Sequence, residues 1–246
     1  MAPDLVWGIH PVLELLRRRP RQIKEVVILK ATPGDRLEKL IDLARQHGVQ
    51  VRFEAKAEND RFQDLKHQGV LARIAPYATM TADELISRLQ SVELPPILLA
   101  LDSIQDPHNL GAIIRTASAA GVTAVILTKD RSAPLAGSAA KVSAGAMAHI
   151  DICLATNLVT TLDRIKQLGF WIYGADMEGS QSIYQADFSG PVCLVVGGEG
   201  KGLRPLVKRK CDFLVAIPMA GSLDSLNVSV AAAVILFEMR RGRLGG

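Results

Sequence analysis

Cysteines are scarce in this sequence, and none of them is paired. Its 246 residues include only Cys153, Cys193 and Cys211, and no two of these form a C-x-x-C motif. This pattern argues against a disulfide-stabilised scaffold and against a zinc site. We therefore expect three buried thiols in a reducing compartment.

Long hydrophobic runs and targeting signals are also missing. The run at residues 230–237 is among the longest apolar stretches, and it falls well short of the ~18 residues that cross a bilayer. The amino terminus has no basic segment followed by an apolar one, as a secretory signal would. We predict a soluble, cytoplasmic protein with no membrane partner.

Standard phosphate-binding motifs are absent, although a glycine-rich turn is present. Residues 192–196 form an apolar run typical of a strand buried on both faces, and Gly197, Gly198, Gly200 and Gly202 follow it. The glycine spacing matches neither the P-loop nor the dinucleotide fingerprint. By themselves, the glycines fit a tight turn as well as a ligand-binding loop.

A second strand and loop follow this turn and favour a ligand. Residues 213–217 repeat the apolar strand pattern and end at Pro218, and residues 221–227 are polar and turn-rich. Residues 227–239 then form a helix rich in Ala and Val. Open α/β sheets bind ligands at the carboxyl ends of adjacent strands, so we expect the two loops to share one site.

Positive charge is concentrated in the first third of the chain. Residues 1–76 contain 14 Lys and Arg against 10 Asp and Glu, whereas residues 77–246 contain 15 of each kind. The excess includes a basic cluster formed by Arg17, Arg18, Arg19, Arg21 and Lys24. Such a cluster is suited to attract phosphates. Its arginines would equally suit the last turn of a helix at residues 11–19, where the helix dipole favours cations.

The sequence predicts two domains joined by a linker. Residues 1–76 indicate a small α/β module, because they combine an amphipathic helix with strand patterns at residues 26–29, 49–53 and 69–74. Residues 77–94 form a linker that contains a short helix at residues 82–89. The larger domain covers residues 95–246 and begins with a strand at residues 97–101.

A strand, a loop, a helix and a second strand occupy residues 101–127. The apolar face of this helix consists of Leu110, Ile113, Ile114 and Ala117. Arg115 therefore points away from the core. Taken alone, Asn109 would be a cap at the start of the helix, and Arg115 would be a solvated charge.

Three motifs together resemble the SpoU (TrmH) family of RNA ribose methyltransferases. The first is N-x-G-x-x-x-R at residues 109–115, and the second is G-E-G-x-G-L at residues 198–203. The third combines I-P-M at residues 217–219 with S-L-N-V-S at residues 225–229. The order and spacing of these motifs are specific to the family.

Three further segments are similar to one subgroup of that family. They read G-I-H-P-V-L at residues 8–13, H-Q-G-V at residues 67–70 and D-R-S-A-P at residues 130–134. This subgroup methylates a guanosine 2′-hydroxyl in 23S rRNA. The resemblance thus covers nearly the whole chain.

The resemblance implies a fold that composition does not predict. It is an α/β fold in which a carboxyl-terminal parallel-sheet domain with a deep trefoil knot (SPOUT class) follows a small L30e-like α/β domain that binds RNA. The resemblance also implies that two copies pair and that the knotted loops bind S-adenosylmethionine. The matching cofactor positions are Gly197, Gly198, Ile217, Met219 and Leu226. A bulky side chain at Gly197 is then expected to enter the cofactor pocket.

The resemblance further implies methyl transfer to a ribose 2′-hydroxyl without a metal. The matching catalytic positions are Asn109, Arg115, Glu199, Ser225 and Asn227. We interpret Arg115 as a guanidinium that stays protonated, grips the substrate phosphate and stabilises the developing alkoxide. Glu199 and Asn227 are expected to hold the loops and Arg115 in place.

The implied partner is 23S rRNA or the assembling large ribosomal subunit. Two alternatives stay open at this point: 2′-O-methylation of a tRNA nucleotide, and a catalytically silent RNA-binding homologue. The intact motif set disfavours the silent homologue, and the amino-terminal module favours the ribosomal substrate.

Overall fold

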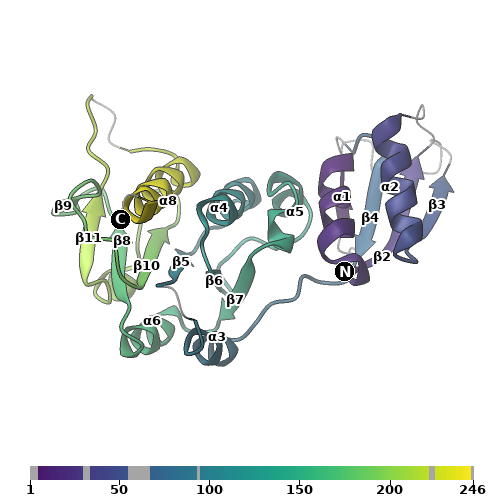
Figure 1. The fold of residues 1–246 in the computed structure, drawn as a ribbon. Coiled ribbons are helices and arrows are strands. Elements are labelled where there is room, and N and C mark those ends of the chain that lie inside the picture. The colour runs from purple at the N-terminus through teal and green to yellow at the C-terminus, as the bar shows by residue number, and fades with distance from the viewer. Residues whose placement is uncertain (1–4, 30–33, 55–66, 93–94, 222–224, 245–246) are drawn as a thin grey trace. The chain divides into compact units, whose positions relative to one another are not determined.

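The chain forms two compact units in a computed structural model that describes residues 5–29, 34–54, 67–92, 95–221 and 225–244. The first unit consists of Met1–Ala78 together with Pro134–His149. The second consists of Thr79–Ala133 and Ile150–Gly246. Figure 1 shows both units and labels most of their elements.

The described part of the first unit is built on a four-stranded sheet. Its strands are β1 (Leu5–Trp7), β2 (Ile23–Leu29), β3 (Gln50–Glu54) and β4 (Val70–Ile74), in the order β1-β4-β2-β3. β4 is antiparallel to both of its neighbours, and β2 and β3 are parallel. Helices α1 (Ile9–Arg18) and α2 (Asp35–Gln46) pack against each other (Figure 1). The three strands and the helix expected in residues 1–76 are confirmed.

A segment from far along the sequence also belongs to the first unit. Pro134–His149 contains α5 (Ser138–Val142) and the short 3-10 helix η3 (Ala146–Ala148). Its buried side chains are those of Ala139, Ala140, Ser143, Met147 and Ala148. The domain limits predicted from the sequence place this segment in the larger domain, because nothing within it indicates what it packs against.

Polar contacts fix this segment to the amino-terminal residues, among them a 3.3 Å hydrogen bond between His149 Nε2 and Glu14 Oε2. The ammonium of Lys141 lies 5.8 Å from the ring centroid of Trp7, a cation–π arrangement. The Nε of Arg19 donates a 3.0 Å hydrogen bond to the carbonyl of Ala148. Arg19 is therefore committed to a structural contact and is less available to phosphates than its place in the basic cluster suggested.

The described part of the second unit is built on a seven-stranded sheet in which all pairings are parallel. The strands are β5 (Ile97–Asp102), β6 (Ala124–Thr128), β7 (Asp151–Ala155), β8 (Trp171–Ala175), β9 (Gln181–Ser182), β10 (Val192–Gly197) and β11 (Phe213–Ala216). Their order is β7-β6-β5-β10-β8-β11-β9. β5 and β10 are buried along their whole length, as predicted for strands covered on both faces.

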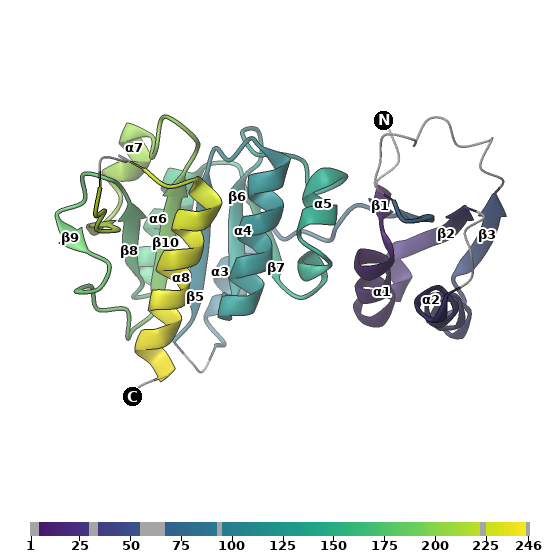
Figure 2. The same cartoon turned by 90° about the horizontal axis from the view of Figure 1, so that it is seen from above.

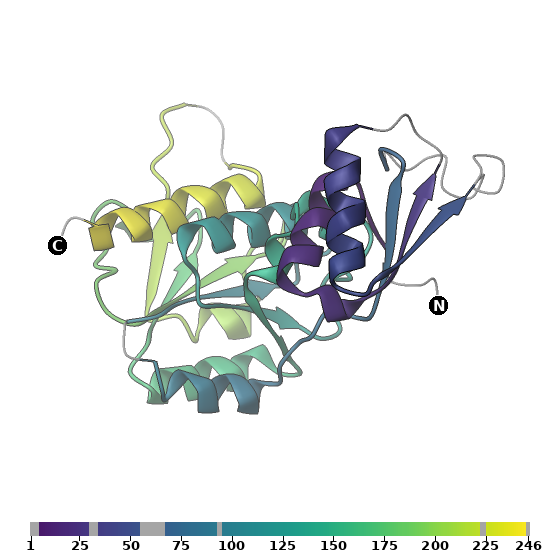
Figure 3. The same cartoon turned by 45° about the vertical axis from the view of Figure 1, so that its right-hand side comes forward.

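Helices cover both faces of this sheet, as Figure 3 shows. One layer contains α4 (Pro107–Ala120) and α8 (Val228–Leu244), which lie side by side in Figure 2. The other contains α3 (Ala82–Leu89) and α6 (Leu158–Gln167). Leu85 and Leu89 of α3 share a buried cluster with Leu158 and Leu162 of α6. The helix predicted within the linker therefore forms part of a core.

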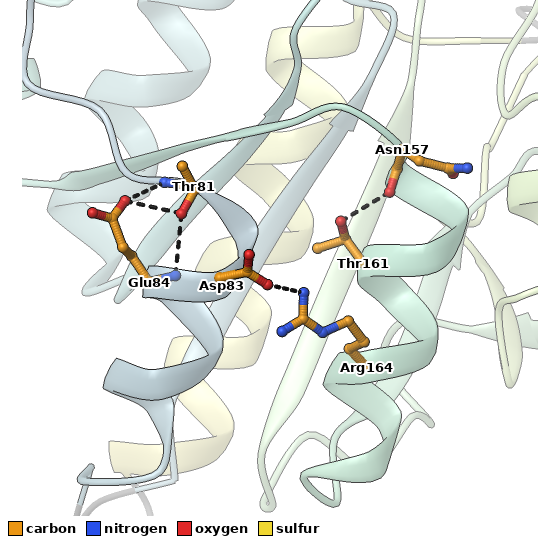
Figure 4. Close-up of polar contacts among 6 residues, drawn as sticks. All are labelled: Thr81, Asp83, Glu84, Asn157, Thr161 and Arg164. Atoms are coloured by element: carbon orange, nitrogen blue, oxygen red, sulfur yellow. Dashed lines mark hydrogen bonds and ion pairs between the residues drawn. The ribbon is translucent and has the colours of Figure 1, made fainter.

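Polar contacts hold α3 in place (Figure 4). The Thr81 hydroxyl accepts from the backbone N–H of Glu84 at 3.2 Å, while the Glu84 carboxylate accepts from the backbone N–H of Thr81 at 2.7 Å. This is a capping box, which satisfies two otherwise free amides. The guanidinium of Arg164 on α6 lies 2.6 Å from the carboxylate of Asp83 and joins the two helices.

The carboxyl-terminal part of the chain returns across the sheet. β11 lies beyond β8 toward one edge, whereas α8 packs against α4 and β10. The chain after β11 therefore passes back over β8 and β10. This path agrees with the knotted carboxyl-terminal fold that the family resemblance implies.

None of the helices in the described part of the chain combines the length and apolarity needed to cross a bilayer.

Candidate active site

The loops that follow β5 and β10 begin side by side. The two strands pair in parallel from Ile97 and Val192 to Asp102 and Gly197. Their carboxyl ends therefore meet at one edge of the sheet, where open α/β folds bind ligands.

Asn109 reaches across this edge instead of capping its helix. The cap of α4 is Asp106, whose carboxylate accepts the backbone N–H of His108 at 2.9 Å. The Nδ2 of Asn109 donates to Glu199 Oε1 at 2.7 Å, and Asn109 Oδ1 accepts from Asn227 Nδ2 at 3.1 Å. The interpretation of Asn109 as a helix cap is therefore wrong.

Asn227 continues this chain of hydrogen bonds into the start of α8. Its Oδ1 accepts from the backbone N–H of Ser229 at 2.9 Å and from the Ser229 hydroxyl at 2.6 Å. Glu199, Asn109, Asn227 and Ser229 thus connect all three motifs. Ser229 stands inside the third motif, but no sequence signal distinguishes it from its neighbours.

The glycine-rich turn is closed by its own backbone. Gly198 and Gly202 form an antiparallel bridge, in which the N–H of Gly202 donates to the carbonyl of Gly198 at 3.1 Å. Gly200 and Gly202 have φ of +76° and +60°, which side chains disfavour.

Gly197 faces this turn and has no room for a side chain. A Cβ added there would lie 2.1 Å from the carbonyl carbon of Gly202. A side chain at Gly197 would therefore collide with the backbone of the turn. The expectation that it would enter a cofactor pocket is corrected accordingly.

A buried carboxylate anchors the far end of the turn. Asp102, the last residue of β5, is fully buried and accepts both the backbone N–H and the Nε of Arg204, at 2.9 Å and 2.6 Å. Arg204 immediately precedes α7 (Pro205–Lys208). Our sequence reasoning missed this pair, although an acidic residue ending an otherwise apolar strand was a usable signal.

The predicted cofactor residues beyond β11 present apolar surface. Met219 and Leu226 are 40% and 36% exposed, and Ile217 is half-buried. Our expectation that the two loops follow adjacent strands is wrong, because β8 lies between β10 and β11. Periodicity identifies buried strands but not their order in a sheet. Part of the predicted polar turn, residues 222–224, lies outside the described residues.

Arg115 and Ser225 are separate from the hydrogen-bonded chain. Both are exposed, and neither makes a hydrogen bond or ion pair with any residue that the structure describes. Arg115 points away from the core, as predicted, on the helix face opposite the buried Ile113 and Ile114. The expectation that Glu199 and Asn227 hold Arg115 in place is therefore not met; they hold Asn109.

A cavity of about 620 Å³ lies elsewhere on the carboxyl edge. Its lining includes Thr128, Arg131, Asn157 and Arg204, but none of the predicted site residues. Among the described residues, no group of three or more His, Cys, Asp or Glu is placed to hold a metal ion.

The three cysteines are not activated. Cys153 and Cys193 are buried, as predicted, and Cys211 is half-buried. Burial raises the pKa of Cys153 to about 11 and that of Cys211 to about 12, and it raises the pKa of Cys193 as well. Thiols in such surroundings stay protonated near neutral pH and are poor nucleophiles.

Comparisons with known proteins show the family of this chain. Residues 96–237 match the SpoU rRNA Methylase family, and residues 5–80 match a family described as RNA 2′-O ribose methyltransferase substrate binding. The chain is similar to the 23S rRNA (guanosine-2′-O-)-methyltransferase RlmB of Pseudomonas putida, with 44% identity over 98% of this chain and 97% of the relative. The RlmB of Escherichia coli is 42% identical over 98% of this chain and 99% of its own.

A solved structure extends the comparison to the fold. The AdoMet-bound rRNA methyltransferase from Sinorhizobium meliloti superposes with a TM-score of 0.76 at 27% identity, covering 97% of this chain and 87% of that one. The expected fold class, a substrate-binding module followed by a parallel-sheet domain of the SPOUT class, is confirmed. The chain belongs to the SpoU rRNA Methylase family.

Proposed function

We propose that this protein transfers a methyl group from S-adenosylmethionine to the ribose 2′-hydroxyl of a guanosine in 23S rRNA. The observation that carries the proposal is the hydrogen-bonded chain from Glu199 through Asn109 to Asn227, because it joins three distant motifs at one sheet edge. The relative named for this reaction aligns with nearly the whole chain, including the amino-terminal module.

The cofactor would be held by residues of the glycine turn and of the segment after β11. Gly197 and Gly198 would offer backbone, and Ile217, Met219 and Leu226 would offer apolar surface for the adenosine. The exposed apolar side chains of Met219 and Leu226 fit such a ligand, since a bound adenosine would cover them. When bound, the cofactor supplies an electrophilic methyl group, so the protein must mainly position the hydroxyl, a contribution of up to ~7–11 kcal/mol.

Arg115 would act on the substrate. Its guanidinium has no partner among the described residues, so its planar set of donors is available to grip a phosphate in two places. It would also stabilise the alkoxide that develops as the hydroxyl proton passes to that phosphate or to water. We assign the exposed hydroxyl of Ser225 to the substrate side of the same site. Asn109, Glu199 and Asn227 would fix the loops.

We further infer a homodimer that works in the cytoplasm on 23S rRNA or the assembling large subunit. One face of α8 packs in the core, while Val230 and Phe237 on the same helix are 47% and 51% exposed. A second copy would cover these side chains in a two-fold contact. Light scattering at micromolar concentration should give about twice 26.5 kDa, and a fully active monomer would overturn the dimer.

The test of the function is methyl transfer from labelled cofactor to total RNA, followed by mapping of the modified ribose. The proposal expects label on one guanosine of 23S rRNA. Label confined to tRNA would support the tRNA alternative. RNA binding without any transfer would identify a silent homologue.

A further inference from the structure

The first unit carries a cleft of about 350 Å³ between α1 and α2. Its lining consists of Ile9, His10, Leu13, Arg17, Arg36, Lys39 and Gln68. Three of these residues are cationic and none is acidic. Ile9 and Leu13 contribute apolar side chains to the lining.

The lining residues form two rows that face each other. His10, Leu13 and Arg17 follow one another at single-turn spacing along α1, and Arg36 and Lys39 do the same on α2. From His10 to Arg17 the row extends about 10 Å at 1.5 Å per residue. The cationic rim is therefore longer than a single phosphate group.

The cations of α2 are free to bind an anion. Arg36 and Lys39 are exposed, and neither forms a hydrogen bond or ion pair with any described residue. Arg17 is 56% exposed and lies 2.7 Å from Glu14. Asp35 and Glu38 are on α2 as well, but they are not part of the lining.

Gln68 closes one end of the cleft. Its Oε1 accepts the backbone N–H of Ile9 at 3.3 Å, at the start of α1, where Gly8 has no side chain to cap the helix. Its backbone is held at φ +53°, a conformation uncommon for residues other than glycine. The side-chain NH₂ of Gln68 has no acceptor among the described residues, so it remains available to a ligand at the cleft.

We propose that this cleft binds the sugar–phosphate backbone of the RNA substrate. Arg36, Lys39 and Arg17 would contact successive phosphates, and the ring of His10 would stack on a base, as imidazoles do in single-stranded RNA sites. The proposal rests on the proposed function for the identity of the RNA. It assigns the RNA affinity of the first unit to one cleft and not to its general excess of positive charge.

The test compares two arginines of the same helix. Arg45 lies on the opposite face of α2 from Arg36, is 68% exposed and is outside the cleft. Arg36→Gln and Arg45→Gln therefore remove the same charge from the same module. Binding of the full-length variants to a 23S rRNA transcript is measured over a range of salt concentrations, and thermal melting confirms that both variants are folded.

Arg36→Gln should weaken RNA binding. It should also reduce the magnitude of the slope of log binding constant against log salt concentration by about 0.7, the value expected per phosphate contact on single-stranded RNA, and adding Lys39→Gln should double that reduction. Arg45→Gln should leave the slope unchanged. Equal losses of RNA affinity in Arg36→Gln and Arg45→Gln would overturn the proposal that the cleft binds RNA, because net charge would then explain the binding. Methyl transfer to the same transcript is measured in parallel. If the wild-type protein binds the transcript through Arg36 but transfers no methyl group, the proposed function is refuted, whereas the proposal that the cleft binds RNA is retained.

Discussion

Asp102 and Arg204 stand 102 residues apart in the sequence and make a two-point contact at the sheet edge. The Asp102 carboxylate is fully buried and accepts the backbone N–H and the Nε of Arg204 at 2.9 Å and 2.6 Å. A buried carboxylate is costly unless it is paired, so this contact fixes the position of Arg204. The glycine turn is thereby held at one end by β10 and at the other by Asp102.

Asp102→Ala should loosen the glycine turn. We expect a loss of about 1–3 kcal/mol in the free energy of unfolding, because the two hydrogen bonds of Arg204 lose their acceptor, together with weaker binding of S-adenosylmethionine. Urea unfolding and calorimetry measure the two effects. The control is Asp163→Ala, which removes a more exposed ion pair with Lys210 at 2.8 Å and should cost less than about 1 kcal/mol. Equal effects of both substitutions would contradict the anchoring role.

Arg115→Ala should separate chemistry from cofactor binding. Arg115 is exposed on α4 and contacts none of the described residues around the predicted cofactor positions by hydrogen bond or ion pair. We expect near-native affinity for S-adenosylmethionine and a single-turnover methylation rate lower by ~10²–10³-fold, as for loss of one charge-stabilising donor.

Arg115→Lys should recover little of this rate, because an ammonium does not reproduce the two-pronged grip of a guanidinium. Calorimetry with the cofactor alone, beside single-turnover rates on rRNA, checks both variants. If Arg115→Ala lost cofactor binding and kept its rate at saturating cofactor, Arg115 would belong to the cofactor pocket.

Gly197→Ala should damage the turn even though it adds a single carbon. The new Cβ would lie 2.1 Å from the Gly202 backbone, so the turn must shift, at a cost of about 1–3 kcal/mol for such overpacking. Cofactor binding should fall with it. The matched control is Gly190→Ala, whose Cβ would meet nothing within 4 Å. Thermal melting and cofactor calorimetry of both variants provide the comparison, and an unaffected Gly197→Ala protein would show that the turn adapts.

Deletion of residues 1–76 should remove RNA affinity and also expose the segment Pro134–His149. The sequence alone predicts that the truncated protein remains a folded, cofactor-binding dimer. In the structure, Met147 and Ala148 are buried in the first unit, and Lys141 lies over Trp7. Limited trypsin digestion should therefore cleave after Lys141 in the truncated protein and spare that bond in the intact chain. Equal protection in both would mean that the segment folds without the module.

Cysteine reactivity should follow folding. The raised pKa of Cys153, about 11, means that its thiol stays neutral at pH 7, so iodoacetamide should modify the native protein slowly and the urea-unfolded protein fast. The unfolded thiol ionises at lower pH than the folded one. The contribution of the buried, neutral Cys153 thiol to the free energy of unfolding is therefore complete below about pH 9 and is lost as the pH rises toward 11. Rapid modification of Cys153 in the native protein would contradict its burial.

The sequence by itself determined the buried strands and the main site helix. The apolar runs at residues 97–101 and 192–196 became β5 and β10, and the apolar spacing of α4 correctly turned Arg115 away from the core. These features follow from the local sequence, because the spacing of apolar side chains along a strand or a helix shows which of its faces is buried. The motif set and its spacing likewise identified the family before any fold was known.

Only the tertiary structure decided which of these pieces meet. It placed β8 between β10 and β11, gave the capping of α4 to Asp106, and turned Asn109 toward Glu199 and Asn227. It also paired Asp102 with Arg204 and packed Pro134–His149 into the first unit. Each of these contacts joins residues that are distant in sequence. The spacing of side chains within one element does not predict these contacts, because they depend on strand order and on the path of the chain between elements.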